Sequence, residues 1–248
     1  MEEIYSWIAI SLILSGTGTS FAFWKAMKAR KRLVDSIGPE ATIEIPEMGE
    51  TDAKKYFSNV SLMMGILSFT AFTNTILVCI LIFIFGIPTE VINNIVIGAV
   101  LAVGISSMFT NLGRTMIYDE AISGLNEFGE GSAENFGKHM VFLVLFEPSS
   151  IYGLLIAILG FVFSGLLNGS VADLTASQAN MFLLGCALLG ISASSNILSG
   201  RMFNRVDGPV NKSEELFSKK IRSLVIPHLI NIIGLVTAIY LMIQAGFM

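Results

Sequence analysis

The chain has 248 residues, of which 53% are hydrophobic and only 14% charged, and its formal net charge is −4. Because a soluble domain carries nearer a quarter of charged residues, this composition excludes an ordinary soluble domain and predicts a membrane protein. Its basic residues do not form a cluster interleaved with aromatic residues, so we expect no nucleic-acid partner.

Six stretches are apolar over a length that can cross a bilayer, which takes about 20 residues. They cover 4–24, 57–87, 91–113, 139–168, 178–200 and 221–247. The second and fourth are longer than a bilayer requires, so we expect them to tilt or to project beyond it. We therefore predict an all-α membrane protein with six transmembrane helices.

The basic residues sort to alternate connections between these spans. All 15 lie after the first, third or fifth span, whereas GIPTEVINN, LNGSVADLTASQAN and both termini carry none. Since Lys and Arg concentrate on the cytoplasmic side of a membrane, we expect these three connections inside the cell and both termini outside it. This sorting assigns Arg114 and Lys138 to the connection between the third and fourth spans.

The spans group into three hairpins of one orientation, over 1–88, 89–170 and 171–248. Each begins with a span rich in small and polar residues, ILSGTGTSFAF, VGISSMFTNLGR or GISASSNILSGR, and closes with a bulkier span. Repeats of two spans keep one orientation, so these repeats are parallel. Small residues let helices approach closely. Two arrangements are open: a ring of wedge-shaped hairpins and a compact six-helix bundle.

One carboxylate, Glu147 in LFEPSSIYGLLIAI, lies well inside a span. A charge near the bilayer centre costs about 2.5–3.5 kcal/mol on insertion scales. The membrane therefore favours the neutral acid unless a cation compensates the charge. A carboxylate in this position can take up and release a proton or bind a small cation. The alternative is a structural Glu that is hydrogen-bonded to a neighbouring helix.

The residues after Glu147 supply further groups to this position. Pro148 removes a backbone hydrogen bond and is expected to kink the helix. Ser149, Ser150 and Tyr152 place hydroxyls within about one turn, where they can support a proton or the shell of a cation. Ser149 and Ser150 have a second explanation, which is to satisfy the backbone group that Pro148 frees.

The segment 147–154, EPSSIYGL, resembles the ion-binding helix of proteolipid (c, or K) subunits of V-type and archaeal-type rotary ATPases. That family typically reads E-x-x-small-apolar-Y-G-apolar there. The preceding Phe136-Gly137-Lys138 is similar to the family's lead-in to the outer helix. The resemblance is strong over 136–160, fair over 95–168 and weaker over 178–246, and for the first hairpin it rests on topology alone.

The resemblance implies a rotor-ring subunit with no catalytic residue of its own. Glu147 would receive H+ or Na+ from one half-channel of a stator subunit and release it to the other, coupled to ATP hydrolysis or synthesis. The implied partners are a homo-oligomeric ring or a mixed ring with another proteolipid, the stator, central-stalk subunits and the lipid bilayer. No cofactor is implied beyond the transported ion, and a prokaryotic plasma membrane is favoured over a vacuolar-type endomembrane.

The other two hairpins depart from this pattern. Aligning Gly234 with Gly153 puts His228 where Glu147 stands, either as a titrating group or as a hydrogen-bonding relic. In the first hairpin Ser68 falls at the site, with Thr73 and Asn74 nearby. One chain then carries one ion site for three hairpins.

The identity of the ion depends on the third span. Na+ needs several oxygen ligands, which Ser107, Thr110 and Asn111 supply if they lie level with Glu147. These residues serve equally as interhelical hydrogen-bond partners. A proton needs only the Glu and an acceptor, so we expect H+.

The first cytoplasmic loop, 25–56, begins basic and continues acidic with two prolines. We expect either a solvated connector or a docking surface for a central-stalk subunit. The rival class of protein is a six-helix secondary transporter or channel that uses Glu147 as its coupling residue. Transporters tend to show inverted repeats and several polar groups at the midplane, whereas this chain has parallel hairpins and one Glu. A third reading is a structural ring member with an incidental Glu.

Overall fold

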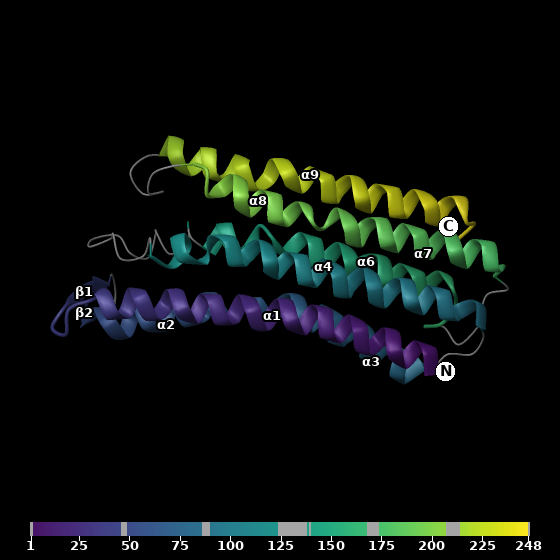
Figure 1. The fold of residues 1–248 in the computed structure, drawn as a ribbon, viewed down its shortest axis with the longest axis horizontal. Helices are drawn as coiled ribbons and strands as arrows, with labels where there is room; N and C mark the ends of the chain where they lie inside the picture. Colours follow the sequence, from purple (N-terminus) through teal and green to yellow (C-terminus); the bar gives the residue numbers. More distant parts are fainter. Residues whose placement is uncertain are drawn as a thin grey trace.

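The computed structural model describes residues 2–45, 49–85, 90–123, 138, 140–167, 174–206 and 214–247. Within these residues six helices are long and apolar enough to span a membrane. They cover Ile4–Ser36, Ala53–Phe85, Asn93–Ile122, Met140–Phe163, Ala176–Phe203 and Glu214–Gln244. The prediction of a mostly helical, multi-pass membrane protein is confirmed, and the helices run side by side along the long axis of the molecule (Figure 1).

The elements follow one another in the order α1 (Glu2–Ser36), β1 (Thr42–Ile45), β2 (Gly49–Asp52), α2 (Ala53–Ile66), α3 (Ser68–Phe85), α4 (Glu90–Ser123), α6 (Glu147–Phe163), α7 (Ala176–Ser192), α8 (Ser195–Phe203) and α9 (Glu214–Gln244). A short helical stretch at 140–144 leads into α6. α1 and α4 extend well past 24 and 113, where the predicted spans end, because their apolar positions continue at helical spacing.

The described residues of the segment 25–56 form mainly helix and strand, and most of the described side chains of β1 and β2 are exposed to solvent. α1 continues through it to Ser36, and β1 and β2 pair as an antiparallel ribbon with Thr42 opposite Asp52. Asp52 then caps α2, because its side chain accepts a hydrogen bond from the backbone N–H of Lys55 at 3.0 Å. Ile43 of the ribbon is buried in one cluster with apolar residues of α1 and α2. Ile43 is therefore the residue through which β1 packs onto the helices, since alternate side chains of a strand point to opposite faces.

Three of the spans are interrupted. The interruptions fall at Leu67 between α2 and α3, at 145–146 before α6, and at 193–194 between α7 and α8. Pro148 explains the second, because it has no N–H to donate back along the helix. Such interruptions free backbone groups inside the apolar interior, and these groups need other partners.

The helices form two layers. α1, α4 and α7 form one layer, in which α4 contacts both α1 and α7. α3 packs on α1 and α4, α6 on α4, and α9 on α7 and α8. α6 also contacts α3 on one side and α9 on the other, so the residues of α6 meet groups from all three parts of the chain.

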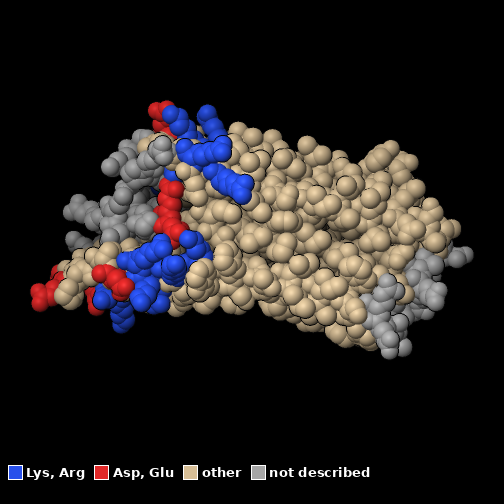
Figure 2. All heavy atoms as spheres, in the orientation of Figure 1, with Lys and Arg blue, Asp and Glu red and all other residues tan. Residues whose placement is uncertain are grey.

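Charged side chains gather at one end of the molecule on the face shown in Figure 2. The ends of the chain marked in Figure 1 lie at the opposite end. Ion pairs join helices at the charged end: Lys25 of α1 lies 2.5 Å from Asp119 of α4, and Lys220 of α9 pairs with Glu120 of α4. This separation agrees with the sorting of the basic residues in the sequence.

Gly153 allows the closest approach of α6 to α4. A Cβ at this position would lie 2.8 Å from the carbonyl oxygen of Ala102 and 3.0 Å from the Cα of Val103. Because both contacts are backbone atoms, Gly153→Ala is expected to destabilise the protein by about 1–3 kcal/mol, measured by unfolding in mixed micelles. The matched control is Gly16→Ala in α1, whose Cβ meets only the ring of Phe72 at 3.6 Å. Equal stability of the two variants would contradict this prediction.

Candidate functional site

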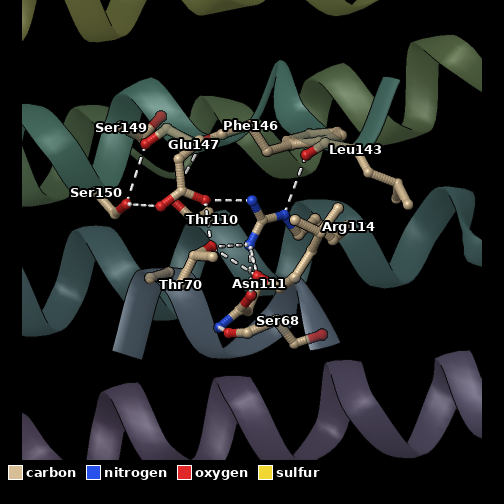
Figure 3. Close-up of polar contacts among 12 residues, drawn as sticks. Ser68, Thr70, Thr110, Asn111, Arg114, Leu143, Phe146, Glu147, Ser149 and Ser150 are labelled. Carbon is tan, nitrogen blue, oxygen red and sulfur yellow. Dashed lines mark hydrogen bonds and ion pairs between the residues drawn. The ribbon is translucent and has the colours of Figure 1, made fainter. Parts of the chain in front are cut away.

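Glu147 is the first residue of α6, directly after the interruption of its span. Its Oε2 accepts a hydrogen bond from Thr70 Oγ1 at 2.7 Å and forms an ion pair with Arg114. Its Oε1 accepts from Ser150 Oγ at 3.1 Å (Figure 3). The side chain is 18% exposed, so the carboxylate is held by the protein but still open on one side. The N-terminus of α6 adds a favourable field for its negative charge.

Arg114 lies in the last third of α4 and its side chain is fully buried. Besides the Glu147 carboxylate, it binds two backbone carbonyls next to the interruptions: Nε donates to Leu143 at 3.1 Å and Nη1 to Leu67 at 2.7 Å. Nη1 also lies 3.3 Å from the side-chain oxygen of Asn111. One guanidinium thus satisfies freed groups of two neighbouring spans and balances the charge of the carboxylate.

The third spanning helix extends past residue 113, where the predicted span ends, so Arg114 lies within a helix rather than in a connection between helices. α4 continues to Ser123, and the apolar residues Ile117, Tyr118, Ala121 and Ile122 after Arg114 are all fully buried. Their helical spacing was the signal that the span continues past residue 113. Arg114 therefore lies inside the Asn93–Ile122 helix, where an unpaired cation would be costly.

Of the candidate supporting residues on α6, Ser150 alone bonds the carboxylate. Ser149 points to the other side and accepts hydrogen bonds from Asn196 at 2.9 Å and Asn231 at 2.6 Å. Tyr152 stacks near His228, with 5.8 Å between ring centroids. The carbonyl of Leu143, next to the interruption, is bound by Arg114 and not by Ser149 or Ser150. The hydroxyl of Ser150 also lies 3.0 Å from the backbone carbonyl of Glu147.

The candidate oxygen ligands on α4 lie near the site but bind other groups. Ser107 donates to the carbonyl of Ala71 at 2.7 Å, and Thr110 to the carbonyl of Phe146 at 3.3 Å. Asn111 holds Arg114 and donates to Ser68 O at 2.9 Å. In this arrangement these residues tie helices together, and none of them bonds Glu147 in the described part of the chain.

The first hairpin contributes to the site through Thr70 of α3, which sequence reasoning missed. Ser68, the expected counterpart of Glu147, lies 2.8 Å from the hydroxyl of Tyr118 instead. Asn74 donates to Ser150 at 3.0 Å, whereas Thr73 bonds only the backbone of its own helix. The site is therefore built between α3, α4 and α6. A hydroxyl one helical turn before Asn74 is a weak sequence signal, because such residues are common in spanning helices.

The third hairpin carries a second buried polar cluster. Asn231 of α9 and Asn196 of α8 meet Ser149 of α6, and Ser192 of α7 donates to Asn231 at 3.2 Å. These groups satisfy one another in an apolar interior. His228 does not join them: its Nε2 is buried and has no hydrogen-bond partner among the described residues.

The cluster around Glu147 places the cationic guanidinium of Arg114, from the same chain, against its carboxyl group. A proton can bind if the guanidinium moves off Oε2, because Oε1 and Oε2 both face hydroxyls that accept as well as donate. A metal cation at the same oxygens would lie against the charge of Arg114. The arrangement therefore suits proton exchange better than binding of Na+.

No family model, no curated protein and no solved structure matches this chain. The fold and site define a multi-pass integral membrane protein with a Glu–Arg pair set among interrupted helices.

Proposed function

We propose that the chain is a non-catalytic rotor-ring subunit of a V/A-type rotary ATPase, in which Glu147 carries H+ by reversible protonation. The observation that carries this proposal is the Glu147 carboxylate within the Met140–Phe163 span, 18% exposed and held by Thr70, Ser150 and Arg114. The exposed side of the Glu147 carboxyl group can face a stator subunit, while Arg114 on its buried side balances the charge.

The packing of the helices supports the assembly into a ring. α1, α4 and α7, which carry the small-residue spans, make one layer, and α3, α6 and α9 make the other. Three wedge-shaped hairpins of this kind can continue into copies of the chain, or into a second proteolipid, around a closed circle. The basic end would face the cytoplasm, where the β1–β2 ribbon offers a surface to a central stalk.

A ring of such chains would carry one ion site for every three hairpins. Each rotation of the ring then moves fewer ions, so more free energy of ATP hydrolysis is spent on each ion. This ratio favours pumping against a steep gradient over ATP synthesis. The ion is H+, because the charge of Arg114 beside Oε2 disfavours a metal cation.

Replacement of Glu147 by Gln is expected to abolish ATP-driven proton uptake by vesicles that contain the assembled complex. The amide keeps the shape of the side chain but cannot exchange a proton, so acid-sensitive dye fluorescence should stay at background. The control is Glu214→Gln at the exposed start of α9, which should transport like the wild type. Normal transport by the Glu147 variant would overturn the proposal.

A six-helix secondary transporter is the second candidate, and one observation favours it. Glu147 finds all its partners, Arg114, Thr70 and Ser150, within one chain. A carrier would use the same carboxylate without a ring. The native mass of the detergent-extracted protein separates the two: a rotor subunit is recovered as a closed oligomer, and a carrier as one chain or a small oligomer with ion transport that needs no ATPase.

A further inference from the structure

Arg114 contacts two kinds of partner at once, and they differ in charge. Its Nη2 faces the Glu147 carboxylate and its Nε faces the backbone carbonyl of Leu143 (Figure 3). Its Nη1 donates to the backbone carbonyl of Leu67. The carbonyls are neutral acceptors and stay in place whatever the state of Glu147. The guanidinium therefore keeps two hydrogen-bond acceptors when the carboxyl group is neutral, but these acceptors do not balance its charge.

Thr70 links the two charged groups. Its hydroxyl donates to Glu147 Oε2 at 2.7 Å and lies 3.3 Å from Arg114 Nη1, for which it is an acceptor. If the guanidinium moves off Oε2, Thr70 can still contact both groups.

We propose that Arg114 is the built-in counter-ion of Glu147, which opposes loading of the carboxylate with a proton or a metal cation until the guanidinium moves away from Oε2. The two states of the site differ by one proton and therefore by one positive charge. In one, the carboxylate pairs with Arg114. In the other, Glu147 carries a proton taken up from outside the chain, and Arg114 stays charged. This inference rests on the proposed function and makes Arg114 a positioning residue that controls when the site loads.

The proposal is tested on the full chain in detergent with dicyclohexylcarbodiimide, which modifies a carboxyl group only in its protonated form. Wild-type protein is expected to react slowly at Glu147 at neutral pH, as followed by mass spectrometry of the modified peptide. Arg114→Gln should react at least about tenfold faster, the lower end of what a nearby opposite charge does to a protonated fraction. Arg114→Lys, which keeps the charge, should remain close to wild type.

The matched control is Arg201→Gln. Arg201 ends the third small-residue span on α8 and is exposed, so its loss should leave the labelling rate of Glu147 unchanged. If Arg114→Gln labels at the wild-type rate, or if Arg201→Gln accelerates labelling equally, Arg114 is not the counter-ion.

A measurement on wild-type protein covers the case in which Arg114→Gln fails to fold. The infrared difference between wild type and Glu147→Gln at neutral pH should contain carboxylate bands and no band of a protonated acid. A protonated-acid band would overturn the proposal. Neither measurement needs transport or a ring, so a failure here is distinct from a failure of the Glu147→Gln transport experiment.

Discussion

Replacing Glu147 by Ala is expected to destabilise the folded protein by about 3–5 kcal/mol, the usual cost of removing one partner from a buried ion pair. The reason is Arg114, whose side chain is fully buried and would keep a charge without its carboxylate. Its carbonyl partners at Leu67 and Leu143 do not neutralise that charge. Reversible unfolding in mixed detergent micelles gives the free energy of unfolding of each variant.

A second replacement separates the ion pair from other effects at this position. Arg114→Gln combined with Glu147→Ala removes the uncompensated charge and leaves an amide that can donate to the carbonyls. The double variant is therefore expected to be more stable than Glu147→Ala alone, because residues in contact are not additive. Additive losses, with the double variant the least stable, would show that the two side chains do not stabilise each other.

Lys220→Met is expected to destabilise the charged end of the molecule by about 3 kcal/mol, the low end for breaking a buried ion pair. The side chain of Lys220 is 1% exposed, and it joins α9 to Glu120 of α4. Its Nζ also lies 4.4 Å from the ring centroid of Phe203 on α8. We choose the low end because the side chain of Glu120 is 32% exposed and can be solvated in part.

The neighbouring residue provides the control for this prediction. Lys219 is exposed and pairs with Glu215 one turn earlier on the same helix, so Lys219→Met should leave the unfolding transition unchanged. The same unfolding measurement applies to both variants. Similar losses for Lys219→Met and Lys220→Met would mean that burial of the Lys220 pair has no effect on stability.

The membrane-spanning helices could be predicted from the sequence because hydropathy depends on composition over about 20 residues, which is local information. Glu147 could be singled out for the same reason, since a charge in an apolar run is visible without knowing its neighbours. Ser150 followed from its spacing of three residues from Glu147, which puts both side chains on one helix face.

The partners of Glu147 on other helices could not be found in this way. Arg114 was assigned to a connection because basic residues usually mark the ends of spans, and α4 is an exception that extends past it. Thr70 is an ordinary polar residue of a spanning helix, and nothing local distinguishes it from Thr73, which bonds only its own backbone.

By itself, therefore, the sequence determined the six apolar helices, the separation of charge between the two ends and the position of Glu147 within an apolar run. The tertiary structure alone decided that this carboxylate is paired, that Arg114 is its partner, and that Ser149 turns away to Asn196 and Asn231. The physical reason is that hydrophobic burial acts on whole stretches of chain. Hydrogen bonds and ion pairs depend instead on angstrom-scale distances between atoms that are far apart in sequence, and helix packing sets those distances.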